Sequence, residues 1–225
     1  MLYDERAVKE NLRNRQGKRV FILGKSDTLT PSARDWLSRE RIAVLPPEEA
    51  KPQRWKLSGG GFLEEKPEHM THLDGDTLAP KTHPRIRFRG AVDTLEAELL
   101  LCGKAVEEVL QLSRRLIRCD VLGEPVGEIR LYGLTEAQQR ERSHFPQKYY
   151  GIPHFMPDFS DSPQLLQLNR ARCAARRAEL AAVAAFSDGE GNPTRPDILT
   201  ACNRISSMLY ILMLQAKAGK PLPKG

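Results

Sequence analysis

Two arginines and a glutamate recur at helical spacing in the C-terminal half of the chain. Arg172, Arg176 and Glu179 are four and three residues apart, so a helix places them on one stripe. Two guanidinium groups on adjacent turns can bind phosphate oxygens bidentately, and a nearby carboxylate can orient one of them. The pattern indicates a polyphosphate site, and its alternative is a solvated helix face with paired charges.

A polar amide near the end of the chain is the next candidate for binding. Asn203 lies one residue from Cys202, which belongs to an apolar seam at helical spacing. A polar group at the edge of a buried face needs a hydrogen-bond partner. That partner is either a bound ligand or a group on a neighbouring helix.

Four helices with apolar seams are predicted to position these residues. They cover about 85–102, 104–118, 163–186 and the segment from Pro196 onward. Their apolar residues alternate spacings of four and three, which is typical of helices that pack against one another, as in a bundle. The intervening residues 119–162 are rich in proline and glycine and are predicted to be irregular. A loop of that length inside a compact domain is usually functional.

The first 56 residues are predicted to form a small mixed unit with a β-α-β pattern. The expected elements are a helix at Tyr3–Gln16, a strand at Arg19–Leu23, a helix at Pro31–Glu40 and a strand at Ile42–Leu45. Thr30 and Pro31 form a strong helix start, because a hydroxyl can cap the helix and proline suits its first position. Residues 51–83 contain three consecutive glycines, several prolines and many charges, a composition typical of a linker.

The predicted fold class is therefore mainly α, a four-helix bundle with a small N-terminal α/β extension. The expected domains are the N-terminal unit over 1–56, a linker over 57–83 and the bundle over 84–225.

Composition narrows the classes of protein that the chain can belong to. The net charge is +6, but Lys and Arg are spread along the 225 residues without a nucleic-acid-binding signature, so no nucleic-acid partner is expected. No apolar run approaches the roughly 18–20 residues that span a bilayer, and the first residues do not resemble a secretory signal. The four cysteines are scattered without a CxxC pair, which favours a reduced, cytoplasmic protein without a membrane anchor.

The order of several motifs resembles one enzyme family. The chain is similar to the ATP:corrinoid adenosyltransferases of the four-helix-bundle type, and more closely to their ethanolamine-utilisation branch. Besides the Ala-Arg-x-x-x-Arg-Arg-Ala-Glu and Asn-Arg-x-Ser motifs, the resemblance rests on Leu29–Arg34, Thr71–Leu73, Asp120–Gly127 and Arg195–Thr200. These pieces occur in the same order over nearly the whole length.

The resemblance implies transfer of the 5′-deoxyadenosyl group of ATP to the cobalt of reduced cobalamin, which gives adenosylcobalamin and triphosphate. ATP, Mg²⁺ and the corrinoid cobalamin are the implied cofactors and substrates. Arg172 and Arg176 would contact the triphosphate, Glu179 would support that site, and Asn203 would lie in the nucleotide pocket. Asp93 is the best counterpart of an aspartate that pairs with the first arginine across subunits, and its alternative is a surface charge.

Two further segments correspond to functional parts of the family. Lys25, Asp27 and Thr28 lie in the nearest equivalent of a loop that wraps the triphosphate, although this segment could equally be a turn that leads to the Thr30 cap. Phe155 is the best candidate for the apolar residue that removes the lower axial ligand of cobalt, which makes Co(II) reducible. Its alternative is a phenylalanine that covers the end of the bundle core.

The chain departs from the ethanolamine branch at its metal site. Members of that branch often carry a histidine followed by a Cys-Cys-x-x-Cys cluster, but the interval over about 52–70 contains no cysteine here. His69 and His72 remain, and two histidines alone are poor evidence for a site, so no structural metal is expected.

The resemblance also implies a set of partners. We expect a homotrimer with sites at the subunit junctions, a cobalamin reductase and an adenosylcobalamin-dependent lyase, in the cytoplasm or inside a bacterial microcompartment. The alternative function is a non-catalytic adenosylcobalamin carrier or a docking protein of a metabolosome.

Overall fold

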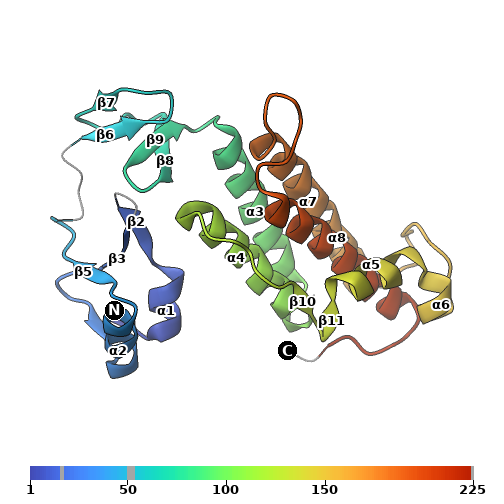
Figure 1. Cartoon of the computed structure of the whole chain (residues 1–225). Helices are drawn as coiled ribbons and strands as arrows, with labels where there is room; N and C mark the ends of the chain where they lie inside the picture. The colour runs from blue at the N-terminus through green and yellow to red at the C-terminus, as the bar shows by residue number, and fades with distance from the viewer. Residues whose placement is uncertain (16–17, 50–53, 224–225) are drawn as a thin grey trace. The chain divides into compact units, whose positions relative to one another are not determined.

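The computed structural model describes residues 1–15, 18–49 and 54–223. Helices account for about half of these residues and the strands are short, so the predicted mainly helical class is confirmed. The chain divides into two compact units (Figure 1). The first contains Met1–His83 and Arg118–Glu124, and the second contains Pro84–Ile117 and the chain from Pro125 onward.

A β-α-β arrangement forms the N-terminal part of the first unit, as predicted. β3 (Lys18–Ile22) pairs in parallel with β5 (Ala43–Leu45), and α2 (Pro31–Arg39) connects the two strands. The Thr30 hydroxyl caps α2 by accepting from the Ala33 amide at 3.3 Å. The core of this part consists of Val8, Leu12, Phe21, Ala33, Trp36, Leu37 and Ile42.

The helix predicted over Tyr3–Gln16 is wrong in length. α1 covers only Glu5–Glu10 and is followed by β2 (Arg13–Arg15), which pairs antiparallel with β3. β2 consists of Arg, Asn and Arg, so no apolar alternation in the sequence could indicate a strand there. Gln16, the predicted end of the helix, lies outside the described residues. β1 (Leu2–Tyr3) and β4 (Thr28–Leu29) form a separate parallel pair.

The segment 57–83, predicted to be a linker, instead contains most of a four-stranded sheet. Its strands are β6 (Trp55–Leu57), β7 (Phe62–Leu63), β8 (Met70–Asp74) and β9 (Thr77–Pro80). Their spatial order is β7-β6-β9-β8, with β6 parallel to β9 and the other neighbours antiparallel. Gly60 and Gly61 have φ of 96° and 87° and turn the chain between β6 and β7. The glycines that suggested a linker therefore form a hairpin turn.

Long helices dominate the second unit. In chain order its helices are α3 (Pro84–Leu101), the 3-10 turn η1 (Lys104–Val106), α4 (Glu107–Leu122), α5 (Glu136–His144), α6 (Pro146–Tyr150), α7 (Pro163–Ala185) and α8 (Pro196–Lys217). The last turn of α4 is counted with the first unit. Gly103, with φ of 74°, separates α3 from η1 and α4, as predicted.

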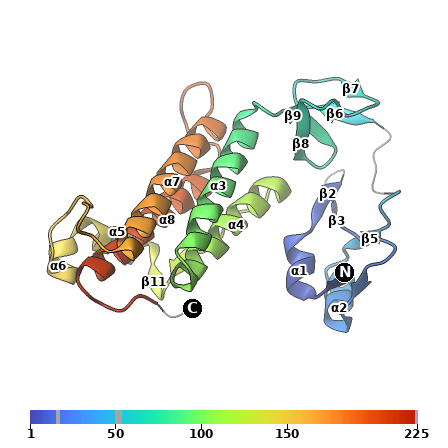
Figure 2. The same cartoon turned by 180° about the vertical axis from the view of Figure 1, so that it is seen from behind.

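α7 is the central helix of this unit. It packs against α3 on one side and α8 on the other, and the three run side by side in both views (Figures 1 and 2). The predicted alanine seam of α7 is largely buried, at Ala171, Ala175, Ala178 and Ala182. Small side chains let the neighbouring helices approach closely, so α7 holds its flanking charged residues against α8. An ion pair of 3.2 Å between Arg114 and Glu96 joins α4 to α3.

The segment over 119–162, predicted to be irregular, contains two short helices and a hairpin. β10 (Arg130–Leu131) and β11 (Leu134–Thr135) form the hairpin, and α5 starts directly after it and packs on α8. α5 has few apolar residues, so no apolar periodicity predicts a helix there. However, Thr135 and Gln138 form a reciprocal capping box, so the Thr-x-x-Gln motif is the feature of the sequence that indicates the start of this helix.

α8 is long and apolar enough, by length and composition, to cross a membrane. However, 61% of its most apolar window is buried inside the chain, as in a core helix. Its sequence contains no uninterrupted apolar run of that length, because polar residues such as Asn203 and Arg204 interrupt it.

Candidate functional site

Three of the predicted residues of the helical unit, Arg172, Glu179 and Asn203, lie on the facing surfaces of α7 and α8. The Asn203 side-chain amide donates to Oε1 of Glu179 at 2.8 Å, so these two residues lie opposite each other. Seven residues away on each helix, the Arg172 guanidinium lies over the ring of Tyr210, with 6.0 Å to the ring centroid. The antiparallel pairing of α7 and α8 therefore places both contacts along one strip.

Asn203 is held from two sides. Its Nδ2 donates to Glu179 and its Oδ1 accepts from Arg204, which also donates to the carbonyl of Glu136 at 3.4 Å. The interhelical hydrogen bond that was the alternative to a ligand contact is therefore present. Arg204 is buried, and burial lowers the pKa of its guanidinium. The sequence did not single out Arg204, although it directly follows Asn203.

The two predicted phosphate-binding arginines differ in environment. Arg172 is half-buried and donates to Oδ1 of Asn169 through Nε at 3.3 Å and Nη2 at 3.0 Å. Arg176 is exposed and makes no hydrogen bond or ion pair with the described residues. Arg172 is thus oriented in advance, whereas Arg176 is free to take an anionic partner.

Phe155 lies against α8 on the segment that leads into α7. Its ring stacks on Tyr210 with 6.1 Å between centroids, and the Lys217 ammonium lies 5.5 Å from the Phe155 centroid. Phe155 is half-buried, whereas Phe145 and Phe159 are exposed. Phe155 is therefore the phenylalanine of this segment that packs next to the arginine stripe.

The remaining predicted residues lie elsewhere. Asp93 is exposed on α3 and has no hydrogen bond or ion pair within the described part of the chain. Lys25, Asp27 and Thr28 belong to the first unit. The Gly24 amide donates to Oδ2 of Asp27 at 3.2 Å, so Lys25 and Asp27 lie in a turn, and Thr28 is the first residue of β4.

Two cysteines of the helical unit, Cys102 and Cys202, do not offer thiolates. Burial raises the pKa of Cys202 to about 12 and that of Cys102 to about 11, so both thiols are protonated at neutral pH. Among the described residues, no group of three or more His, Cys, Asp or Glu side chains could hold a metal ion. His72 packs edge-on against Trp55 at 4.9 Å.

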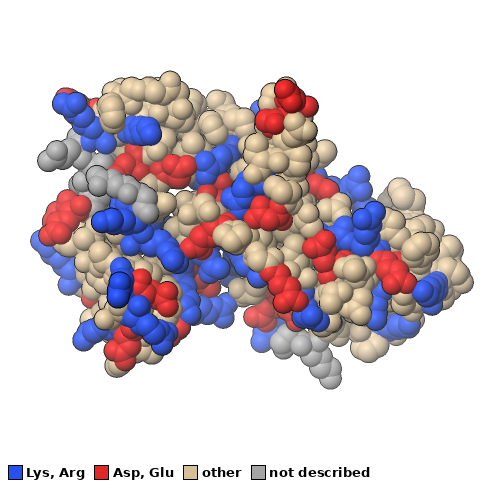
Figure 3. Space-filling view, viewed as in Figure 1, with Lys and Arg blue, Asp and Glu red and all other residues tan. Residues whose placement is uncertain are grey.

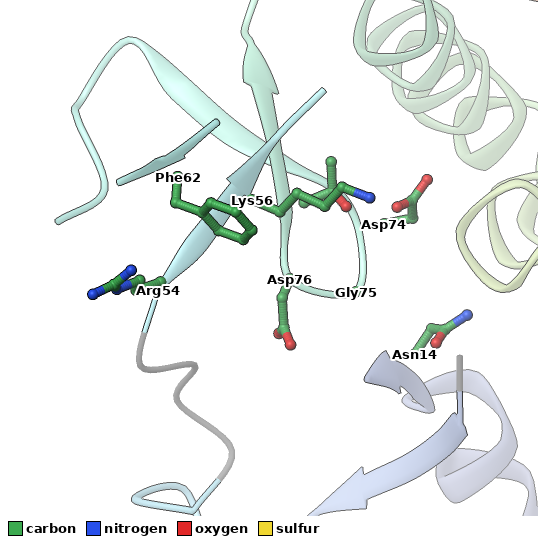
Figure 4. A pocket seen from close by; sticks show the side chains of 8 residues that line it. Asn14, Arg54, Lys56, Phe62, Asp74, Gly75 and Asp76 are labelled. Atoms are coloured by element: carbon green, nitrogen blue, oxygen red, sulfur yellow. The ribbon is translucent and has the colours of Figure 1, made fainter. Parts of the chain in front are cut away.

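A cavity of about 370 Å³ lies in the first unit (Figure 4). It is lined by Asn14, Arg54, Lys56, Phe62, Asp74, Gly75, Asp76 and Thr77. Asp76, one of the lining residues, forms an ion pair with Arg15, which holds the β8–β9 turn against β2. None of the residues predicted to bind ligands lines this cavity. Over the faces visible in Figure 3, basic and acidic side chains are interspersed.

Comparison with known proteins assigns this helical unit. The family model for cobalamin adenosyltransferase matches residues 62–216. The chain belongs to this family. The matched range begins in the β6–β9 sheet and includes α3, α7 and α8, so the adenosyltransferase unit contains all the contacts between α7 and α8 described above.

The curated relatives belong to the ethanolamine-utilisation type of adenosyltransferase. The chain is 32% identical over 225 residues to the corrinoid adenosyltransferase EutT of Salmonella typhimurium, covering 86% of this chain and 84% of the relative. It is 31% identical over 168 residues to EutT of Escherichia coli, covering 71% of this chain. The chain spans 63% of the length of the Escherichia coli relative. No solved structure matches significantly.

Proposed function

We propose that this adenosyltransferase moves the 5′-deoxyadenosyl group of ATP to the cobalt of reduced cobalamin and releases triphosphate. The observation that carries the proposal is that the residues matched by the family model include a strip on α7 and α8 in which Arg172, Glu179 and Asn203 are held in place beside the exposed Arg176. The names of the relatives, corrinoid adenosyltransferases, support the same substrate class.

The arginines are proposed to bind the triphosphate. Arg172 and Arg176 are one helical turn apart, and Arg176 has no competing partner among the described residues. Glu179 and Arg204 fix the orientation of the Asn203 amide, so that it can serve as a rigid wall or hydrogen-bonding edge for the nucleoside. Mg²⁺ would enter with ATP, where it neutralises triphosphate charge, and we assign it no ligand from the protein.

The reaction depends more on how the protein positions its two substrates than on reactive side chains. The Co(I) of the reduced corrinoid is the nucleophile, so the Co–C5′ bond forms as the C5′–O bond breaks. The triphosphate leaves with the electron pair of the broken bond, and guanidinium groups already in place stabilise the charge that it gains. Holding C5′ in line with cobalt supplies the rest of the rate enhancement.

Phe155 is proposed to face the lower side of the corrinoid. Its half-buried ring is held between Tyr210 and Lys217, so it is fixed at a defined place next to the arginine stripe. A large apolar ring there excludes water and the axial base from cobalt. Four-coordinate Co(II) would result, and it is easier to reduce than the five-coordinate form.

The family's quaternary arrangement is part of the proposal. We propose that α3, α4, α7 and α8 are the four helices of a bundle and that three chains assemble with the sites at their junctions. The stripe of Arg176 continues into Leu180 and Val183, which are exposed apolar residues. A second chain that covers them would also approach Arg176 and complete the site, with Asp93 as the cross-subunit partner of Arg172.

The cellular setting follows from the same family. We propose that the protein acts in the cytoplasm or inside a microcompartment, beside a cobalamin reductase and an adenosylcobalamin-dependent lyase. The second candidate function, a carrier of adenosylcobalamin, would use the same pocket without chemistry.

The proposal is tested by mixing the protein, Mg-ATP and chemically reduced cobalamin without oxygen. We expect the visible spectrum of the Co(I) species to convert to that of adenosylcobalamin, only when ATP is present. Persistence of the Co(I) spectrum beside intact ATP would reject the enzyme.

A further inference from the structure

Tyr210 joins the two parts of the proposed site, and no sequence motif pointed to it. It lies on α8 seven residues after Asn203, so both residues share one face of the helix. The Arg172 guanidinium lies over its ring, 6.0 Å from the centroid. The rings of His154 and Phe155 also stack on Tyr210, with centroids 5.8 Å and 6.1 Å away. Tyr210 is therefore in contact with both the phosphate-binding residue and the corrinoid-facing residue.

The hydroxyl of Tyr210 has a definite direction. Nε2 of His154 lies 3.2 Å from the carbonyl oxygen of His144, and a carbonyl can only accept, so Nε2 carries the hydrogen. In the neutral ring, Nδ1 is then an acceptor, and it lies 3.1 Å from the Tyr210 hydroxyl, which donates to it. A chain of hydrogen bonds therefore runs from α8 through His154 to the end of α5.

A second contact holds the far side of the same segment. Lys217, seven residues after Tyr210, lies over Phe155 and forms a 2.5 Å ion pair with the buried Asp161. Tyr210 and Lys217 thus share a face of α8 and hold the 154–161 segment from two points. Both contacts of Phe155 with α8, to Tyr210 and to Lys217, therefore lie on one face of a single helix.

We infer that Tyr210 is a positioning residue that couples nucleotide binding at Arg172 to the placement of Phe155 against the corrinoid. This inference rests on the proposed function. A triphosphate that draws Arg172 toward itself weakens the contact between the guanidinium and the Tyr210 ring. The Tyr210 ring then shifts, and its stacking and hydroxyl contacts shift His154 and Phe155 with it. Four-coordinate Co(II) would then form well only when ATP is bound.

Two substitutions separate the ring from the hydroxyl. Tyr210→Phe keeps the ring under Arg172 and beside Phe155, but it removes the hydrogen bond to His154. Tyr210→Leu removes both. Tyr132→Phe is the matched control, because it also deletes one tyrosine hydroxyl, which donates to the Ala105 carbonyl at 2.9 Å away from the predicted residues.

The test measures two quantities on the full chain: the KM for ATP with preformed Co(I), and the fraction of four-coordinate Co(II) with saturating ATP. For Tyr210→Phe we expect a KM within about twofold of the parent and a four-coordinate fraction that is about fivefold smaller, the size of one hydrogen bond. For Tyr210→Leu we expect a KM at least about threefold higher, from the lost cation–π contact, and an even smaller four-coordinate fraction.

The outcomes distinguish failure of the role inferred for Tyr210 from failure of the proposed function. An active parent with both Tyr210 variants equal to Tyr132→Phe would overturn the inference and leave the proposed function standing. A Tyr210→Phe variant with an unchanged four-coordinate fraction would also overturn it, even if Tyr210→Leu is poorly folded. A parent that forms no adenosylcobalamin would reject the proposed function itself, and the inference with it.

Discussion

At the scale of single residues, the proposed site combines fixed groups with free ones. Asn203 has both polar atoms of its amide engaged, and Arg172 is bonded to Asn169, so the geometry of these side chains is set before any ligand arrives. Arg176 is exposed and can reorganise around an anion. This combination favours binding of a flexible polyphosphate chain, because Arg176 can adapt to the chain while Arg172 and Asn203 already have fixed orientations.

We predict that Arg172→Ala and Arg176→Ala each lower kcat/KM for ATP by about tenfold or more. Charge-assisted contacts of this kind are worth roughly 1.5–3 kcal/mol, and both side chains lie beside the alanine seam, so the helices should stay folded. Arg177→Ala, an exposed arginine of the same helix, is the control and should stay within about twofold. Steady-state kinetics and thermal melts check this, and equal kinetics in all three variants would remove the arginines from the site.

Phe155→Ala should slow the reaction that starts from Co(II)-cobalamin and affect the reaction from preformed Co(I) much less. Loss of the ring lets a fifth ligand return to cobalt, and it leaves the arginines in place. Phe159→Ala is the matched control, because Phe159 is exposed in the same segment. The spectrum of Co(II)-cobalamin with ATP and protein gives the four-coordinate fraction. If Phe155→Ala keeps the parent's fraction, another residue has this role.

At the scale of elements, the start of α8 is tied to the loop that follows α4. Asp197 pairs with Arg195 at 2.9 Å and accepts from the Val126 amide at 3.0 Å. The hydrogen bond from Arg195 lowers the pKa of Asp197 to about 2. Because α8 carries Asn203 and Tyr210, this contact also fixes the register of the proposed site.

Asp197→Asn should destabilise the protein by up to about 2.5 kcal/mol at pH 7, since a lowering of the pKa from 3.8 to about 2 corresponds to roughly that free energy. Because the pKa of Asp197 is lower in the folded than in the unfolded protein, its carboxylate stabilises the folded protein at pH values above about 4. This contribution to the free energy of unfolding disappears as the pH falls from about 4 toward 2. Denaturant unfolding at pH 7 and near pH 2 measures both effects. Glu107→Gln, an exposed carboxylate on α4, serves as the control, and a variant difference that persists at low pH would contradict the assignment.

The elements that could be predicted are those whose own pattern is sufficient. Apolar residues at alternating spacings of four and three, with proline at the first helical position, predict α7 and α8. The Thr30 cap before Pro31 predicts α2. The β6–β9 sheet could not be read, because strands of two to five residues give too little alternation and the Gly60–Gly61 turn looks like a linker. In the site, the stripe of Arg172 and Arg176 follows from spacing alone, but the role of Tyr210 follows only from the packing of α7 on α8, and that of Arg204 only from the packing of α5 on α8.

At the scale of the whole molecule, the long helices carry exposed apolar residues that a second chain could bury. Leu180 is 70% exposed on α7 and continues the Arg176 stripe, and Leu100 and Leu101 are exposed at the end of α3. Isolated exposed leucines are common, but three on the helices that carry the site are consistent with assembly around it.

We therefore predict that Leu180→Asp lowers the solution mass toward that of one chain, without loss of helical circular dichroism. A charge in a subunit contact is costly because it is removed from water without a partner. Phe62→Asp, at an exposed phenylalanine of the first unit, should leave the mass unchanged. Light scattering after size-exclusion chromatography provides the measurement, and a parent that is already monomeric would reject the proposed trimer.

Counting turnovers tests the central claim most directly, because it separates an enzyme from a carrier. A small amount of protein is given excess Mg-ATP and excess chemically reduced cobalamin, and adenosylcobalamin and triphosphate are both quantified. The account predicts many adenosylcobalamin molecules per protein chain, with one triphosphate released for each. Tight binding of added adenosylcobalamin at about one per chain, with none formed from ATP, would contradict it and identify a carrier.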